Sequence, residues 1–195
     1  TIKIFTMPYK FIQETELKGL FRLQPQIFGD ARGWYSPSLE VSEFEAATGI
    51  KFRLTQVASS FNARRGIFRG LHFQKPETQG KIVMATSGSV LDIGLDIRQN
   101  SPTFGQHISE ILSAEKQNQL WLPPGFAHGY LALEDNTCFT YYVTDGVYSP
   151  KSEKGVNPFD PALNIDLPFS RNEIKFSDKD LVLPNLIDIP KEDLL

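Results

Sequence analysis

Short runs of alternating apolar and polar residues fill the middle of the chain, from Ile50 to Val143. This period of two predicts β-strands, and turn residues such as Gly88 and Pro123-Pro124-Gly125 separate them. Because no helical segments lie between the strands, the pattern favours an antiparallel sandwich or barrel over a doubly wound sheet. The strands are expected at 51–58, 67–74, 80–87, 89–97, 107–112, 118–122, 129–133 and 137–144.

The pattern is weaker on either side of this region. Residues 1–19 are expected to form an arm and a first strand, and residues 20–25 another strand. Residues 28–33 are interpreted as a loop. One helix is predicted over 38–48, with Ser38 as its cap and Gly49 at its end. Residues 150–195 are rich in loops, with a turn or short helix at 177–180, and a chain of 195 residues without a linker or repeat predicts one domain over 1–195.

Composition excludes several classes of protein. A formal net charge of −3 leaves no bulk basic surface for nucleic acid, so no nucleic-acid partner is expected. Cys138 is the one cysteine, which excludes an intrachain disulfide and suits a reducing compartment. No apolar run reaches the ~18 residues of a membrane span, and the start lacks a signal pattern. We therefore expect a soluble, cytoplasmic protein without a membrane partner. Glycine-rich nucleotide loops and the serine nucleophile elbow are also missing.

Histidine supplies the first candidate for chemistry, because its pKa lies near working pH. His72 lies within the predicted strand 67–74 and is either a packed, hydrogen-bonded residue or a general base. A metal site on a β-barrel favours two histidines separated by one residue. Gln74 occupies the position where the second would stand, so a metal ion is disfavoured.

Charged residues inside otherwise apolar strands are further candidates. Arg69 and Lys81 each need an acidic partner or an anionic ligand there. Simple alternation places Arg69 and His72 on opposite faces, and a bulge at Gly70 would bring them to the same one. Asp92 lies opposite the apolar face of strand 89–97, where it is either solvated or lines the concave face of a barrel.

Two adjacent tyrosines lie in the last predicted strand. Alternation groups Tyr141 with Phe139 and Val143 on an apolar face, and it groups Tyr142 with threonines on a more polar face. If one of the two tyrosines performs chemistry, alternation selects Tyr142 and assigns Tyr141 to the core.

A series of motifs along residues 20–186 resembles one enzyme family, the nucleotide-sugar 4-keto-hexose epimerases known as the dTDP-4-dehydrorhamnose 3,5-epimerase family. So many motifs in order make a chance match implausible. The motifs are Asp30-Ala31-Arg32-Gly33, Phe68-Arg69-Gly70-Leu71-His72-Phe73-Gln74, Gln79-Gly80-Lys81, Asp92-Ile93-Gly94-Leu95-Asp96-Ile97-Arg98, Ser101-Pro102-Thr103-Phe104-Gly105, Leu112-Ser113-Ala114-Glu115, Gln119-Leu120-Trp121-Leu122-Pro123-Pro124-Gly125-Phe126-Ala127-His128-Gly129, Asp160-Pro161-Ala162-Leu163 and Ser177-Asp178-Lys179-Asp180.

The resemblance implies a mostly β fold, a cupin-type double-stranded β-helix (jelly roll) with a few short helices. It also implies a reaction. A ketone at C4 of the sugar acidifies the protons on C3 and C5, a base removes one, and an acid returns a proton to the opposite face. His72 matches the base, Asp180 the carboxylate that pairs with it, Lys81 the cation near the enolate oxygen, and Tyr142 the acid.

The resemblance also implies how substrate is bound. Asp92 matches a buried acidic position near the base, and His128 a supporting residue of the pocket. Tyr35 matches an aromatic residue that stacks on the nucleobase across a homodimer interface. No cofactor and no metal ion are expected. Four residues match positions on the nucleotide and diphosphate side, namely Arg32, Gln56, Arg69 and Glu153.

The chain departs from the family pattern at Ala58, where the family often has asparagine, and at Leu167, where it has tryptophan. The leading hypothesis is a 3,5-epimerase that converts dTDP-4-dehydro-6-deoxy-D-glucose into dTDP-4-dehydro-L-rhamnose. One alternative is an epimerase of C3 alone or C5 alone that acts on another nucleotide-linked 4-keto sugar. Another is a non-catalytic, sugar-binding jelly roll, although binding alone needs no acid–base pair.

Overall fold

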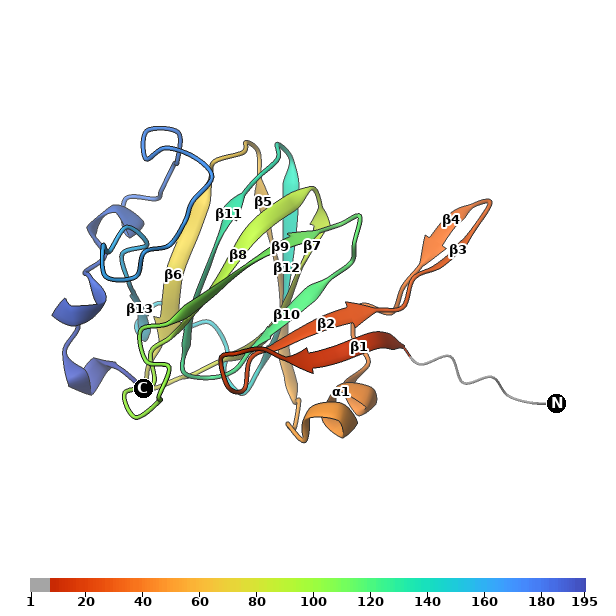
Figure 1. Ribbon diagram of the computed structural model, residues 1–195, viewed down its shortest axis with the longest axis horizontal. Helices are drawn as coiled ribbons and strands as arrows, with labels where there is room; N and C mark the ends of the chain where they lie inside the picture. The colour runs from red at the N-terminus through yellow and green to blue at the C-terminus, as the bar shows by residue number, and fades with distance from the viewer. Residues whose placement is uncertain (1–7) are drawn as a thin grey trace.

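The computed structural model describes residues 8–195, and two antiparallel sheets facing each other dominate it (Figure 1). The six-stranded sheet has the order β1-β2-β10-β7-β12-β5, and the five-stranded sheet the order β13-β6-β11-β8-β9. The strands of the first sheet are β1 (Tyr9–Glu14), β2 (Phe21–Pro25), β10 (Gln119–Leu122), β7 (Gly80–Ser87), β12 (Thr137–Thr144) and β5 (Leu54–Asn62). Those of the second are β13 (Glu153–Gly155), β6 (Phe68–Gln74), β11 (Phe126–Ala132), β8 (Ser89–Asp96) and β9 (His107–Ser113).

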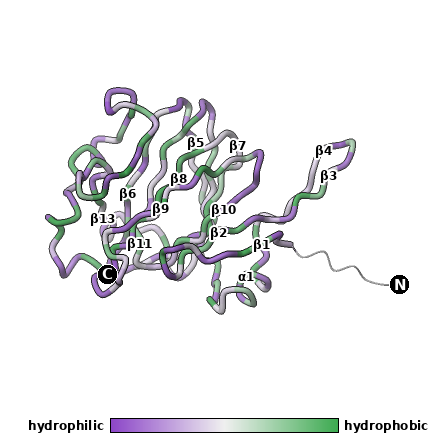
Figure 2. Tube along the Cα trace, in the orientation of Figure 1, coloured by the Kyte–Doolittle hydropathy of each residue, from purple (hydrophilic) through white to green (hydrophobic). Residues whose placement is uncertain are grey.

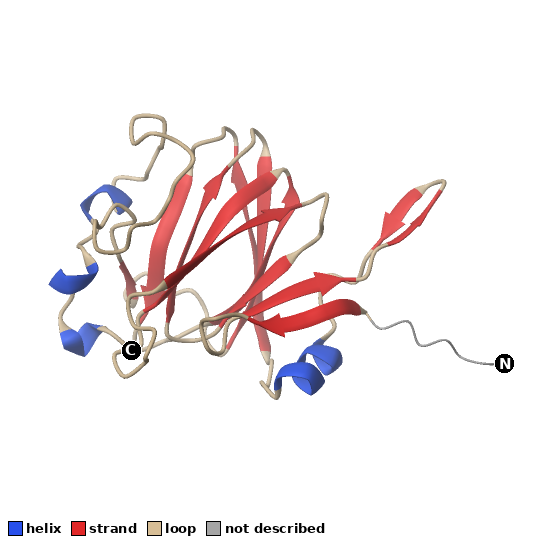
Figure 3. Ribbon diagram, in the orientation of Figure 1, coloured by secondary structure: helices blue, strands red, loops and turns tan. Residues whose placement is uncertain are grey.

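The sequence prediction of an antiparallel sandwich or barrel is confirmed, since each of these strand pairs is antiparallel. Strands dominate the molecule, while helices lie only at its periphery (Figure 3). The expected strands at 80–87 and 137–144 have the predicted bounds, and the first residues of the expected arm, 1–7, lie outside the described residues.

Two local predictions are wrong. Residues 28–33 do not form a loop. They belong to a hairpin of β3 (Phe28–Asp30) and β4 (Gly33–Tyr35), which projects from the body of the molecule (Figure 1). The helix α1 (Val41–Thr48) starts after Glu40, whose backbone is extended, so Ser38 does not cap it. Gly49 ends the helix as predicted, with a left-handed φ of 73° and its N–H donating to the carbonyl of Glu45.

Apolar side chains form three layers. Between the sheets lie residues such as Val83, Ile108 and Phe139. The outer face of the six-stranded sheet packs under α1, where Phe44 contacts Trp121 edge-on at 5.2 Å between ring centroids. The outer face of the five-stranded sheet is covered by the C-terminal region, which carries the short helices η1 (Asp180–Val182), η2 (Leu186–Asp188) and η3 (Lys191–Asp193). Figure 2 shows the mixture of hydrophobic and hydrophilic positions along the strands that this layering requires.

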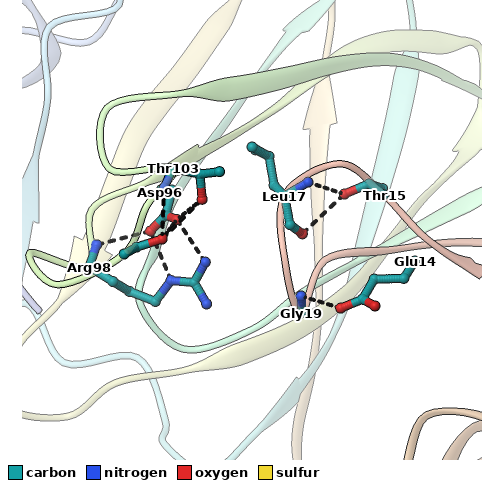
Figure 4. Close-up of polar contacts among 8 residues, drawn as sticks. Glu14, Thr15, Leu17, Gly19, Asp96, Arg98 and Thr103 are labelled. Atoms are coloured by element: carbon teal, nitrogen blue, oxygen red, sulfur yellow. Dashed lines mark hydrogen bonds and ion pairs between the residues drawn. The ribbon is translucent and has the colours of Figure 1, made fainter.

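Asp96, at the end of β8, organises the loop that follows. Its fully buried carboxylate accepts hydrogen bonds from the guanidinium and backbone N–H of Arg98 and from the hydroxyls of Ser101 and Thr103 (Figure 4). These hydrogen bonds offset most of the desolvation cost of burying the carboxylate charge. The ordered loop anchors the C-terminal region, because the N–H of Gln99 donates to the carbonyl of Leu195 at 2.6 Å.

No helix within residues 8–195 combines the length and the apolar character that a bilayer crossing demands.

Candidate active site

A bulge in β6 places His72 and Arg69 on the same cavity wall. His72 pairs with His128 of β11, and Arg69 pairs with Tyr130, so β6 has one more residue than β11 between these pairs. Both side chains line an open cavity of about 560 Å³. Gly70 adopts a φ of 116°, and a Cβ there would lie 2.6 Å from the carbonyl oxygen of His128. The bulge predicted at Gly70 is therefore confirmed.

His72 is paired with the carboxylate expected from the motifs. Its Nε2 lies 2.6 Å from Oδ1 of Asp180, which is 5% exposed at the start of η1. Burial alone would raise the pKa of Asp180, but hydrogen bonds from His72 and Ser177 hold it below its usual value. The carboxylate is thus ionised at neutral pH, orients the imidazole and leaves the other ring nitrogen for a ligand in the cavity.

A second carboxylate, Glu153 of β13, also approaches His72. Its Oε1 lies 3.5 Å from Nε2 of His72 and 2.5 Å from the ammonium of Lys179, while the hydroxyl of Tyr148 donates to its other oxygen. Burial alone would raise the pKa of Glu153, but the hydrogen bonds from Lys179 and Tyr148 lower it. Glu153, which the resemblance assigns to the nucleotide side, therefore belongs to the group of charges around His72.

Lys81 of β7 points between the sheets. Together with Gln56 and Tyr141 it lines an adjoining cavity of about 240 Å³. Burial lowers the pKa of Lys81 to about 8, although the carboxylates of Glu153 and Asp92 favour its charged form. An ammonium in such a position is poised to interact with an anion bound in the cavity.

Asp92 and His128 form a buried pair on the inner face of the five-stranded sheet. Oδ2 of Asp92 lies 2.8 Å from Nε2 of His128, and the other carboxylate oxygen has no hydrogen-bond partner within residues 8–195. Of the two positions open for Asp92, the concave face of the barrel is the correct one, because the apolar face of β8 packs outward under the C-terminal region.

The structure reverses the predicted placement of the two tyrosines. Tyr141 lines the cavity that His72 lines, with its ring edge-on to Phe139 at 5.1 Å. Tyr142 lies on the outer face of the sheet and packs with the cluster that contains Phe44 and Trp121. The apolar face of β12 faces the barrel interior, which at this end holds the cavity instead of core. The prediction that Tyr142 faces the site is therefore wrong.

The residues expected at the nucleotide divide into two groups. Arg69 and Gln56 line the two cavities, whereas Arg32 and Tyr35 lie on the projecting β3–β4 hairpin. Arg32 forms an ion pair with Asp30, and Tyr35 is 67% exposed. Nothing within the described part of this one chain brings the hairpin to His72.

Sequence reasoning missed two residues of the site, Tyr148 and Lys179, which both contact Glu153. Lys179 precedes Asp180 in one of the motifs that carry the family resemblance, and this position next to the expected carboxylate could have indicated it. Tyr148 lies in a loop, where no periodicity indicates the direction of a side chain. No group of three His, Cys, Asp or Glu side chains with the arrangement of a metal site occurs in residues 8–195.

Comparison with known proteins gives a consistent result. The family model described as dTDP-4-dehydrorhamnose 3,5-epimerase matches residues 14–188. The dTDP-4-dehydrorhamnose 3,5-epimerase of Salmonella typhimurium is 41% identical over 174 residues, which cover 89% of this chain and 93% of that protein. The corresponding enzyme of Shigella flexneri is 39% identical over 90% of this chain and 95% of that protein.

Solved structures show the same similarity. The dTDP-6-deoxy-D-glucose-3,5-epimerase of Legionella pneumophila, in complex with dTDP-4-keto-L-rhamnose, superposes with a TM-score of 0.90 and 40% identity over 94% of this chain and 96% of that chain. A 3'-monoepimerase of Streptomyces bikiniensis, in complex with dTDP-quinovose, gives 0.82 and 31% over 90% and 87%. The predicted cupin-type jelly roll is thereby confirmed.

Proposed function

The chain belongs to the dTDP-4-dehydrorhamnose 3,5-epimerase family, and from this premise we propose that it converts dTDP-4-dehydro-6-deoxy-D-glucose into dTDP-4-dehydro-L-rhamnose by inverting C3 and C5. One observation carries the proposal. An imidazole paired with a carboxylate and the half-buried phenol of Tyr141 line the same cavity, and epimerisation needs such a base and acid.

The base is His72. The C4 ketone makes the hydrogens on C3 and C5 acidic, and the imidazole accepts one of them as a proton. The electron pair of the broken C–H bond moves into the enolate, and the negative charge collects on the C4 oxygen. Asp180, which lies 2.6 Å from the ring, stabilises the imidazolium that forms and fixes its orientation.

Lys81 stabilises the enolate. Its ammonium lies between the sheets, where Lys81 and Tyr141 line the same cavity of about 240 Å³. A preorganised positive charge in a site of low dielectric interacts more strongly with the developing oxyanion than with the neutral ketone. The reaction proposed here uses side chains alone, without a cofactor or a metal ion.

Tyr141, and not Tyr142, supplies the proton that completes inversion. The enolate carbon takes the proton of the Tyr141 hydroxyl, and a new C–H bond forms on the face opposite His72. This assignment follows from the placement of Tyr141 in the cavity wall, and it replaces the assignment of Tyr142 that the resemblance implied and strand alternation favoured.

A homodimer would complete the binding site. β5 is an edge strand of the six-stranded sheet and exposes the side chains of Val57 and Phe61, which are 54% and 56% accessible. An exposed apolar edge strand is a surface that pairs with a second chain. The projecting hairpin, with Arg32 and Tyr35, would then reach the nucleotide in the partner's cavity, where the tyrosine stacks on the base.

The proposal is tested by incubating the protein with dTDP-4-dehydro-6-deoxy-D-glucose in D2O and following both deuterium incorporation and configuration by NMR. We expect deuterium at C3 and C5 and inversion at both carbons. Deuterium at C3 alone would instead indicate the 3-epimerase, and no exchange at either carbon would exclude an epimerase of this substrate.

Three variants assign the roles. His72→Asn should lose exchange at both carbons. Tyr141→Phe should still exchange protons through His72 but lose inversion, because the proton returns to the face it left. Tyr142→Phe is the matched control, one residue along the same strand, and should behave like the wild type. A normal Tyr141→Phe together with a defective Tyr142→Phe would overturn the revised assignment.

A further inference from the structure

The hydroxyl of Tyr141 is connected to a chain of polar groups that runs away from the cavity. Oγ of Ser60, on β5, lies 3.5 Å from this hydroxyl and 2.7 Å from the hydroxyl of Tyr130 on β11. Tyr130 is 1% exposed and stacks on Phe139 with ring centroids 4.3 Å apart. The chain thus crosses from one sheet to the other inside the barrel, where every polar group needs a partner.

This chain of polar groups ends at the guanidinium of Arg69. The buried amide of Asn62 donates to the hydroxyl of Tyr130 at 3.0 Å and to the carbonyl of Thr137 at 3.2 Å. The oxygen of the same amide accepts from Nε of Arg69 at 3.0 Å. Arg69 has no acceptor of its own, so the direction of the hydrogen bond at this end is fixed.

The directions of the remaining hydrogen bonds follow from this end. The amide group of Asn62 donates to Tyr130, whose single proton then goes to Ser60 at 2.7 Å, the shorter of its two contacts with an acceptor. Ser60 therefore keeps its own proton for the oxygen of Tyr141. All donors point from the guanidinium toward the phenol, and bonds that align in this way polarise one another.

We propose that Ser60, oriented by Tyr130, is a positioning residue that donates a hydrogen bond to Tyr141 and stabilises the phenolate left after proton transfer. The inference rests on the proposed function, in which Tyr141 gives its proton to the enolate carbon. The electron pair of its O–H bond stays on oxygen, so a negative charge appears inside the barrel. Burial raises the pKa of Tyr141 well above its ordinary value, and the hydrogen bond from Ser60 acts against that effect.

Ser60→Ala tests this role, and Ser59→Ala is its matched control. Ser59 is the preceding residue on β5, and its hydroxyl contacts Thr140 at 3.0 Å without a hydrogen bond to Tyr141 in the described part of the chain. Ser60→Ala should slow inversion by about 10- to 100-fold, the effect of losing one hydrogen bond to a charged group. Deuterium exchange through His72 should change little, whereas Ser59→Ala should leave both rates as in the wild type.

The ratio of the inversion rate to the deuterium-exchange rate shows whether Ser60 positions Tyr141 or only supports the fold. A destabilised fold would slow both reactions together and leave the ratio unchanged. Ser60→Thr restores a hydroxyl and should restore the ratio. Tyr130→Phe, which keeps the ring packing on Phe139, should lower the ratio less than Ser60→Ala because Ser60 can still donate to Tyr141. If Ser60→Ala keeps the wild-type melting temperature and the wild-type ratio of inversion to exchange, the inference is overturned.

Tyr141→Phe distinguishes the failure of this inference from the failure of the proposed function. If Tyr141→Phe blocks inversion while Ser60→Ala has the wild-type ratio, the acid is correctly assigned and the role of Ser60 is refuted. If Tyr141→Phe inverts normally, the assignment of the acid itself is refuted. If Ser60→Ala lowers the melting temperature, Tyr130→Phe provides the test instead. An unchanged ratio of inversion to exchange in Tyr130→Phe would also refute the role of these hydrogen bonds.

Discussion

Replacing Lys81 with methionine should make the protein more stable and far less active. Burial lowers the pKa of Lys81 from 10.5 to about 8. Since one pKa unit corresponds to about 1.4 kcal/mol, the folded state holds the ammonium at a cost of roughly 3 kcal/mol relative to the neutral amine. Methionine has a similar length and no charge, so Lys81→Met should recover up to about this free energy of unfolding at pH 7.

The stability gain should depend on pH in a defined direction. The pKa in the folded state lies below that of the unfolded chain, so between pH 8 and 10.5 the unfolded chain binds more protons. The stability contributed by this position therefore rises with pH across that window. The difference in free energy of unfolding between Lys81→Met and wild type should be largest below pH 8 and should vanish above pH 10.5. Urea denaturation at pH 7, 9 and 10.5 measures it.

The activity should depend on Lys81 being protonated. The kcat/KM of the wild type should fall as pH rises through about 8, because kcat/KM reports groups of the free enzyme. Lys81→Met should lose on the order of 10²- to 10³-fold in kcat, as enzymes do when a donor to a developing oxyanion is removed. A wild-type kcat/KM that stays level to pH 9.5, or a variant that is both less stable and fully active, would refute this account of Lys81.

Four further predictions concern the site and the proposed dimer. Asp180→Asn should fold normally by circular dichroism but lose on the order of 10²- to 10⁴-fold in kcat, because the imidazolium loses its charge partner; a wild-type rate would contradict the pairing. Dialysis against a chelator should leave activity intact, and inactivation that a divalent ion reverses would contradict the metal-free mechanism. Phe61→Glu on the edge strand should give a monomer by analytical ultracentrifugation, while Tyr35→Ala should raise KM more than it lowers kcat. A fully active monomer would contradict both.

Strands were the most predictable part of the fold, because glycine and proline turns punctuate them. The bulge at Gly70 was predictable for a different reason. Two candidate site residues, Arg69 and His72, lie on opposite faces by simple alternation, and the glycine between them could hold the bulge that brings them to one face. The β3–β4 hairpin was missed because its strands have only three residues each, too few for an alternating pattern. The start of α1 was missed because the chain stays extended through Glu40, beyond the serine that could cap it.

The two tyrosines show what strand alternation leaves open. On β8 the apolar face packs outward under the C-terminal region, so the polar face, with Asp92, points into the barrel. On β12 the arrangement is inverted, because α1 covers the outer face, where Tyr142 is partly buried against the cluster of Phe44 and Trp121. The inner face then carries Phe139 in the core at one level and Tyr141 at the cavity two residues further on. Alternation correctly separated the faces of both strands, but which face meets substrate depends on what covers the outside of each sheet. That covering comes from segments distant in sequence, so in a jelly roll an aromatic residue on the apolar face deserves equal weight as a candidate acid.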